Sequence, residues 1–281
     1  MSNTWLNQYV ISNGIRFHVA RQGSGPLILL LHGFPENHYA WRYQLAGLSE
    51  HHTVAAPDLR GYHLTEKKGP FDIKTLSADI TGIIRQLGFH KAILVGHDWG
   101  AFIMWQFALD YPGWCEKLIS LNVPYLPRGP KPLHEMLTDS RFDYMRLFQK
   151  PGDAEAMIGS DVNGFFKRMY EGYSRQKNFM SASDQQYFVE AFEAPNAITP
   201  ALEYYRNLTR NWELTEKQVT RKIRVPTLMV VADQDPLLTP AMFDHAEKYV
   251  PDVTIKHINA GHWSQQEAPN DVNQLILDFI A

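Results

Sequence analysis

Residues 91–101 read KAILVGHDWGA, in which an apolar run ends in glycine and is followed by His97 and Asp98. The apolar run predicts a buried strand over residues 91–96, and the residues after Asp98 predict a helix. The small residues Gly96 and Gly100 flank Asp98, which indicates a sharp strand-to-helix turn with no room for neighbouring side chains. Such a turn presents its central residue at the carboxyl end of a sheet, where α/β folds bind ligands. An acidic helix N-cap gives a similar pattern for purely structural reasons, so the rest of the chain must decide.

Five further apolar runs with strand character lie at residues 26–31, 53–58, 117–122, 227–233 and 253–258. Near-continuous apolar strands are typical of a parallel sheet that is covered on both faces. Isoleucines and leucines at helical spacing between residues 73 and 87 predict an intervening helix, which Gly88 would end. The alternation of strands and helices predicts an α/β fold with crossover helices.

Residues 125–222 interrupt this alternation. They contain no comparable apolar strand, begin with a proline-rich stretch and are dense in aromatic residues. The strand pattern resumes at residue 227, which favours a helical cap inserted into one core over an independent helical domain. We therefore expect a core of residues 1–124 and 223–281 with a cap of residues 125–222.

Composition narrows the class of protein. A chain of 281 residues with 44% hydrophobic residues can bury a substantial core, either as one large domain or as a domain with an insertion. A net charge of -3 without a basic run argues against nucleic acid as a partner. The single cysteine, Cys115, cannot form an intramolecular disulfide, which fits a reducing compartment. No signal peptide or membrane-spanning run is evident, so we expect a soluble, cytoplasmic protein, either a monomer or a homodimer.

The turn at Asp98 has partners elsewhere in the chain. The stretch HGFPE (residues 32–36) follows the first strong strand, where hydrolases of this shape place one oxyanion-hole amide, here that of Phe34. The second amide would belong to Trp99, directly after the central residue. Two acids, Asp233 and Asp235, follow a later strand, and His262 follows the last one. The order nucleophile, acid, histidine is the one that this type of fold uses.

The stretches HGFPE, DLRGY, GHDWGA, ADQDPLL and AGHWSQQEAP, in this order and spacing, resemble the α/β-hydrolase-fold epoxide hydrolases of the soluble type from about residue 8 to 281. The resemblance implies an α/β-hydrolase fold, with a mostly parallel central sheet, helices on both faces and an inserted helical cap. By position it implies that Asp98 is the nucleophile, that His262 is the base and that Asp235 orients the histidine. Asp233 is the alternative acid.

The resemblance extends to the cap, where this family uses two tyrosines to hold and protonate the epoxide oxygen. RFDYMRLFQKPG places the first at Tyr144, and LEYYRNLTRNW places the second at Tyr205, with Tyr204 as the alternative one residue earlier. Because the chain has 13 tyrosines, simple packing of an aromatic cap is the competing interpretation. The substrate-binding residues expected from the resemblance are Tyr144, Tyr205, Trp99, Phe34 and Pro35.

One stretch departs from the family. Small residues commonly follow DLRGY, whereas this chain has His63, Leu64 and Thr65. We expect this change to affect access to the pocket more than the chemistry. His38 and His63 both lie in polar sequence typical of loops, and we expect neither to act in catalysis.

The nature of the central residue predicts the reaction. An aspartate is ionised at neutral pH and can displace a leaving group from saturated carbon without a base, forming an alkyl ester. His262 is then free to activate the water that hydrolyses this ester. Epoxides need a proton donor for the departing alkoxide, which tyrosine supplies. We therefore expect an enzyme that converts small apolar epoxides and water to vicinal diols, without metal or organic cofactor.

Two other functions stay open at this level. A haloalkane or haloacid dehalogenase uses the same Asp-His-Asp scheme, and Trp99 would suit the binding of a halide. Residues 99–102 contain no arginine to hold a haloacid carboxylate, which disfavours the haloacid branch. A non-catalytic ligand-binding protein of the same fold is less consistent with a complete set of catalytic residues.

Overall fold

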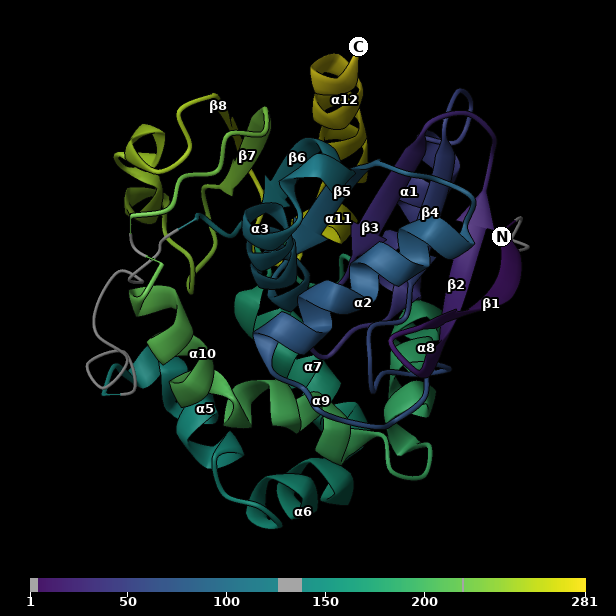
Figure 1. The fold of residues 1–281 in the computed structure, drawn as a ribbon. Helices are drawn as coiled ribbons and strands as arrows, with labels where there is room; N and C mark the ends of the chain where they lie inside the picture. Colours follow the sequence, from purple (N-terminus) through teal and green to yellow (C-terminus); the bar gives the residue numbers. More distant parts are fainter. Residues whose placement is uncertain (1–4, 126–137, 219) are drawn as a thin grey trace.

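The computed structural model of the chain describes residues 5–125, 138–218 and 220–281 (Figure 1). Its centre is an eight-stranded sheet in the order β1-β2-β4-β3-β5-β6-β7-β8. The strands from β4 to β8 in this order run parallel, and β1 and β2 form an antiparallel edge. The strands are β1 (Leu6–Ser12), β2 (Ile15–Gln22), β3 (Leu27–Leu31), β4 (Thr53–Pro57), β5 (Ala92–His97), β6 (Cys115–Leu121), β7 (Thr227–Ala232) and β8 (Val253–Ile258).

Helices cover both faces of the sheet and gather beyond one of its ends (Figure 1). The helices of the core are α1 (Arg42–Gly47), α2 (Ile73–Gln86), α3 (Trp99–Asp110), α11 (Ser264–Glu267) and α12 (Pro269–Ile280). The helices between β6 and β7 are α5 (Asp143–Phe148), α6 (Asp153–Ser160), α7 (Val162–Tyr173), α8 (Ala182–Glu193), α9 (Ile198–Arg206) and α10 (Leu208–Glu216). Within the described ranges, no helix combines the length and apolarity needed to cross a bilayer.

The sheet separates two apolar layers because successive side chains of a strand point to opposite faces. In β3, Leu27, Leu29 and Leu31 join the layer that contains α2 and α3. Ile28 and Leu30 join the opposite layer, which contains α1 and α12. Burial on both faces explains why these strands read as continuous apolar runs, and it confirms the predicted mostly parallel α/β sheet.

The predicted helix after the second apolar run is α2. Asp72 caps its first turn by accepting the Thr75 N–H, and Gly88 just past its end takes a left-handed φ of 91°. Both features were readable from sequence, because an aspartate N-cap and a glycine stop are the residues that helix ends favour.

Among the described residues between β6 and β7, the six helices α5 to α10 lie at the end of the sheet, as the predicted helical cap would (Figure 1). They lie between β6 and β7, which are nevertheless adjacent, with Leu118 paired to Thr227. The insertion therefore leaves the sheet continuous. The ends predicted for the cap, at residues 125 and 222, both fall in the connections between β6 and β7.

The hairpin of β1 and β2 was not predicted from the apolar runs. β1 is half exposed, with polar residues interrupting its apolar ones, so it lacks the continuous run of a buried strand. The signal that was available is its turn. Asn13 and Gly14 have φ values of 49° and 74°, the conformation that Asn-Gly supplies in a two-residue hairpin.

Candidate active site

The turn between β5 and α3 has the strained geometry that its glycines predict. Asp98 has φ 49° and ψ -123°, a conformation that costs energy in a residue with a side chain. A Cβ atom on Gly96 would lie 2.6 Å from the Ala101 Cα, and one on Gly100 would lie 2.0 Å from the Leu31 carbonyl oxygen. Side chains are thus excluded on both sides of Asp98, and the turn lifts its carboxylate out of the end of the sheet.

One oxygen of this carboxylate is held by backbone amides. The Phe34 N–H donates to Asp98 Oδ1 at 2.8 Å. Trp99 is the first residue of α3, so its N–H is among the four that have no acceptor within the helix. A Cβ on Gly33 would lie 2.4 Å from Asp98 Oδ1, so glycine there allows the close approach. The Phe34 N–H at Oδ1 supplies one of the donors that an oxyanion hole requires.

His262 is oriented by a buried carboxylate. Its Nδ1 lies 2.9 Å from Asp235 Oδ2, and the Asn122 amide donates to the same oxygen at 2.8 Å. The backbone N–H groups of Leu237 and Leu238 donate to Asp235 Oδ1 at 2.8 and 3.1 Å. With so many donors Asp235 stays ionised, and it fixes the proton on His262 Nδ1 so that Nε2 faces Asp98.

The spacing between His262 and Asp98 leaves room for a reactant. His262 Nε2 lies 3.9 Å from Asp98 Oδ2, which is too long for a direct hydrogen bond. Burial lowers the pKa of His262, but the charge and hydrogen bond of Asp235 and the charge of Asp98 outweigh it and raise the pKa to about 9. His262 is therefore protonated at neutral pH for as long as Asp98 keeps its negative charge.

A second polar network lies behind His262, and the sequence analysis did not assign it. His97 Nε2 lies 2.7 Å from the His262 carbonyl oxygen. The Glu36 carboxyl accepts from the side chains of Gln265, at 3.1 Å, and Gln266. Burial raises the pKa of Glu36, and the neighbouring His97 opposes that rise. The available signal was position, since His97 and Glu36 lie within the quoted motifs GHDWGA and HGFPE.

The structure separates the two candidate acids. Asp235 is 3% exposed and contacts His262, as described above. Asp233 instead pairs with His257 Nδ1 at 2.7 Å, and both of these side chains are about half exposed. Asp235 is the carboxylate at the site.

The two candidate tyrosines of α9 are separated in the same way. Tyr204 is fully buried, and its hydroxyl donates to the Arg60 carbonyl oxygen at 2.8 Å. Tyr205 packs edge-on against Trp99 and Phe34, with ring centroids 5.2 and 5.1 Å away. Its ring also lies 5.9 Å from that of Tyr144 on α5. Tyr205 and Tyr144 are therefore the pair whose rings meet within range of the charge of Asp98.

Both hydroxyls of this pair hold their protons firmly. Burial raises the pKa of Tyr144 and of Tyr205 well above the ordinary value, and the negative charge of Asp98 adds to both shifts. A hydrogen bond between Tyr144 and Tyr205, and one from Trp99 to Tyr205, act in the opposite direction. Both hydroxyls are thus protonated, and the negative charge of Asp98 acts on each of them.

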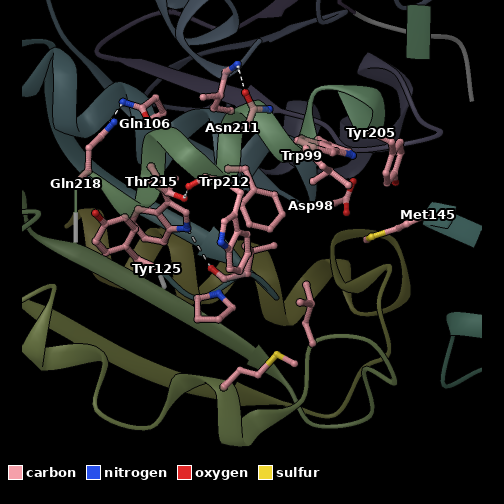
Figure 2. Close-up of a pocket in the computed structure, with 18 of the residues that line it drawn as sticks. Asp98, Trp99, Gln106, Tyr125, Met145, Tyr205, Asn211, Trp212, Thr215 and Gln218 are labelled. Atoms are coloured by element: carbon pink, nitrogen blue, oxygen red, sulfur yellow. Dashed lines mark hydrogen bonds between the residues drawn. The ribbon is translucent and has the colours of Figure 1, made fainter. Parts of the chain in front are cut away.

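An apolar cavity of about 180 Å³ opens beside the carboxylate. Figure 2 shows Asp98, Trp99 and Tyr205 on one side of this cavity and Gln106 and Gln218 on the other. Most of the remaining lining side chains are aromatic or aliphatic. The cavity suits an apolar molecule that reaches Asp98 with one end.

The structure places the other expected binding residues outside the lining of this cavity. Phe34 is 1% exposed, and its ring packs among cap aromatics such as Phe148, 5.4 Å away. Its part in the site is the backbone N–H, not the ring. Pro35 is buried beside it, and Tyr144 reaches the site through its contact with Tyr205.

Comparison with known proteins agrees with this geometry. The sequence profile described as alpha/beta hydrolase fold matches residues 26–269. The bifunctional epoxide hydrolase 2 of the pig (Sus scrofa) is 32% identical over 96% of this chain, and the chain spans about half of that protein, 54% of its length. Epoxide hydrolase A of Mycobacterium tuberculosis is also 32% identical, with 96% of both chains covered.

A solved structure shows the same likeness in three dimensions. An epoxide hydrolase from Vigna radiata superposes with a TM-score of 0.88 and 34% identity, covering 98% of both chains. The similarity thus includes the cap as well as the sheet.

Proposed function

Since this chain belongs to the α/β-hydrolase fold family and is similar over nearly its whole length to epoxide hydrolases, we propose that it is an epoxide hydrolase. It converts an epoxide and water to a vicinal diol through an ester on Asp98. The core of residues 1–124 and 223–281 carries the nucleophile and base, and the cap of residues 125–222 carries the acid. The observation that carries this proposal is that the rings of Tyr144 and Tyr205 meet, 5.9 Å apart, and that Tyr205 lines the same cavity as Asp98.

The first step forms the ester. Asp98 Oδ2 attacks one epoxide carbon while Oδ1 stays in the hydrogen bond from Phe34. The carbon–oxygen bond of the ring breaks, and its electron pair goes to the epoxide oxygen, which takes a proton from Tyr144 or Tyr205. Attack removes the negative charge from Asp98, and that charge is one reason why the tyrosine pKa values are high. The tyrosines therefore become stronger acids as the alkoxide develops.

The second step hydrolyses the ester. Once Asp98 is esterified, His262 loses a neighbouring charge that had raised its pKa, so its Nε2 releases a proton to solvent and can then take one from water. His262 regains that proton from solvent when Asp98 is again a carboxylate. The hydroxide formed from water attacks the ester carbon, and the oxyanion on Oδ1 is held by the Phe34 and Trp99 amides, each worth about 3 kcal/mol in comparable sites. Collapse releases the diol, with the proton on His262 going to its oxygen. The new carboxylic acid of Asp98 returns its proton to the tyrosinate.

The cavity supports an apolar substrate with a polar group beyond its epoxide. Asn211, 8% exposed, lines the cavity and accepts the Ile73 N–H with its Oδ1 at 3.0 Å. Its Nδ2 has no hydrogen-bond partner among the residues that the structure describes. This buried donor would be satisfied by an acceptor on the substrate. The lone Cys115 is compatible with a cytoplasmic enzyme, acting as a monomer or homodimer without metal or organic cofactor in its chemistry.

A side-by-side assay tests the reaction class. Styrene oxide, a haloalkane and fluoroacetate are offered to the purified chain, and diol, halide and fluoride are measured. We expect diol from styrene oxide and no fluoride from fluoroacetate. Halide release without diol formation would replace the proposal with dehalogenation.

The tyrosine pair has its own variant. Tyr144→Phe with Tyr205→Phe removes both proton donors but keeps the rings that pack the cap, so we expect turnover of styrene oxide to fall at least about 100-fold. Tyr111→Phe is the matched control, since Tyr111 follows α3, packs its ring on Phe107 and lies outside the cavity lining. Full epoxide turnover in the double variant would contradict the role given to the pair.

A further inference from the structure

Three histidines converge on one buried aspartate at the junction of the sheet and cap. His18 Nδ1, on β2, lies 2.8 Å from Asp58 Oδ2, just after β4. His38 Nδ1, in the short helix η1 (His38–Trp41), lies 2.8 Å from Asp58 Oδ1. His63 Nδ1 lies 3.2 Å from Asp58 Oδ2. All three rings present the same nitrogen, Nδ1, to the carboxylate.

His63 lies in a turn, as expected, and His38 lies in the short helix η1, but the burial of their side chains was not expected. The side chains of His18, His38 and Asp58 are 0–2% exposed, and that of His63 is 16% exposed. His63 is also the departure from the family pattern after DLRGY. Sequence reasoning missed the cluster because its members lie on three separate segments, namely β2, η1 and the connection after β4. A buried carboxylate needs a positive partner. Burial alone would raise the pKa of Asp58, but the histidines reverse that effect and hold it well below the usual range.

The hydrogen bonds around His18 identify what that positive partner can be. His18 Nε2 lies 3.0 Å from Asn7 Oδ1, an acceptor, and this contact favours the tautomer with the proton on Nε2. In a neutral imidazole, Nδ1 then carries a lone pair that faces the Asp58 carboxylate. That contact is attractive only if a second proton or a metal ion lies between the two atoms. Ligating histidines show this same arrangement, in which the outer nitrogen donates to an oxygen acceptor.

His63 provides a further donor atom. Its backbone has a strained φ of 39°, which is unusual for a residue with a ring. Its Nδ1 is inaccessible to solvent and makes no well-aligned hydrogen bond within the described part of the chain, despite its 3.2 Å approach to Asp58. Its ring stacks on that of His38 with centroids 5.5 Å apart, so both rings approach the carboxylate from the same direction.

From this geometry we propose that His18, His38, Asp58 and His63 bind one divalent transition-metal ion, with Zn²⁺ as the best-matched ion. The ligand atoms of His18, His38 and Asp58 lie within 4.8 Å of one another, and small side-chain adjustments can turn them into a coordination sphere. His63 lies outside this group of three and would join it from its position 3.2 Å from Asp58 Oδ2. Three imidazoles and one carboxylate suit Zn²⁺, whereas Mg²⁺ and Ca²⁺ prefer oxygen ligands alone. Binding needs a lone pair on each Nδ1, so any proton there is released to solvent or, in a ring whose Nε2 is unprotonated, moves to Nε2.

Four protein ligands would leave no open position for a substrate, so the ion is structural and takes no part in the epoxide chemistry. It joins β2 to the segment after β4 and to the loop that follows Phe34, whose amide holds Asp98. Tyr187 on α8 lies 3.4 Å from His38 Nε2, so the cap contacts the same cluster. A bound ion would therefore stabilise both the loop that follows Phe34 and the contact between the cap and the core.

Calorimetric titration of the EDTA-treated full chain with Zn²⁺ tests the proposal. We expect one ion per chain and a rise in melting temperature on the order of 5 °C at saturating metal. Co²⁺ in place of Zn²⁺ should give the visible absorption of a four-coordinate site. Absence of Zn²⁺ binding by the folded wild-type chain would overturn the proposal and leave protons as the only positive partner of Asp58.

Variants locate the ion. His63→Gln and His38→Gln should each weaken Zn²⁺ binding at least about tenfold and reduce the thermal shift. His63→Gln is the safer variant, because His63 is partly exposed and its loss should leave the fold intact. His257→Gln, at the exposed pair with Asp233, and Asp98→Asn, at the reaction centre, should bind Zn²⁺ as the wild type does. Unchanged affinity in the folded His63→Gln and His38→Gln variants, or loss of binding in Asp98→Asn, would place the ion elsewhere and overturn the assignment.

Discussion

At the scale of single residues, the two oxygens of Asp98 have different surroundings. Oδ1 accepts the Phe34 N–H at 2.8 Å, and Oδ2 lies 3.9 Å from His262 Nε2. In the proposed mechanism the first becomes the ester carbonyl and the second forms the new bond to carbon. A serine offers one oxygen and cannot divide these roles. With a carboxylate at the turn, the nucleophile is a carboxylate oxygen. The atom that hydroxide attacks in the second step is then the carbon of that same carboxyl group.

The separate roles of the two Asp98 oxygens predict the step at which the reaction stops when His262 is replaced. His262→Gln keeps a polar side chain of similar length but removes the base, so we expect the ester to form and then hydrolyse at least about 1000-fold more slowly. Intact-protein mass spectrometry after mixing with styrene oxide should show the chain heavier by one substrate. Asp98→Asn is the matched control and should show no added mass. An adduct in Asp98→Asn, or normal turnover in His262→Gln, would contradict the assigned roles.

Sequence could identify the nucleophile and base but not choose between near neighbours. Asp233 and Asp235 both follow β7, and only the path of the chain shows that Asp235 turns inward to His262. Tyr204 and Tyr205 are both buried on α9, but the Tyr204 hydroxyl donates to the Arg60 carbonyl oxygen, whereas the Tyr205 ring packs edge-on against Trp99. Asn122, which positions Asp235, was missed because a single asparagine after a strand gives no signal of its own.

At the scale of elements, the turn at Asp98 depends on how closely α3 approaches β3. Gly100 lies in the first turn of α3, and a Cβ there would meet the Leu31 carbonyl oxygen at 2.0 Å. The neighbouring atom is backbone in a central strand, so it cannot move aside at low cost. The close approach keeps the start of α3, with its free N–H groups, next to the loop that carries Phe34.

Gly100→Ala is therefore expected to be destabilising even though alanine favours helices. Overpacking of this kind typically costs about 1 to 3 kcal/mol, and a clash with backbone should reach the upper part of that range. Gly172→Ala is the matched control, because Gly172 is exposed in α7 with no atom within 4 Å of a new Cβ. There the same change should stabilise by about 0.5 to 1 kcal/mol. Urea unfolding measures both variants, and equal stability of the two would show that the packing argument is wrong.

The burial of an element determines whether the sequence could predict it. β3, β4, β5 and β7 are covered on both faces, so their sequences are apolar runs that stand out. β1 and β2 form an edge with exposed positions, and their pairing depends on the turn at Asn13 and Gly14. The arrangement of the cap helices depends on contacts between segments that are distant in sequence. Composition could locate the cap but could not give its packing.

At the scale of the whole molecule, the proposed mechanism requires the cap to sit correctly on the core, because it places the nucleophile on the core and the tyrosines on the cap. Part of this seating is a polar contact between η1 and the first turn of α8. The Tyr39 hydroxyl donates to Asp184 Oδ1 at 2.7 Å, and Arg42 lies 3.6 Å from Asp184 Oδ2. The rings of Tyr39 and Tyr187 stack beside it at 4.3 Å. These contacts lie next to the proposed metal site, so the two features stabilise the same junction.

Asp184→Ala should loosen this junction without altering the reaction centre. Loss of a hydrogen bond to a charged group, in a partly exposed position, should lower the free energy of unfolding by about 1 to 2 kcal/mol. We expect faster amide hydrogen exchange in α8, with exchange in β5 unchanged, because a junction that opens locally does not unfold the sheet. Glu190→Ala, an exposed position on the same helix, is the control and should leave α8 protected. If α8 exchanged at the wild-type rate in Asp184→Ala, the cap would be held by its apolar contacts alone, and the polar junction would have no part in its seating.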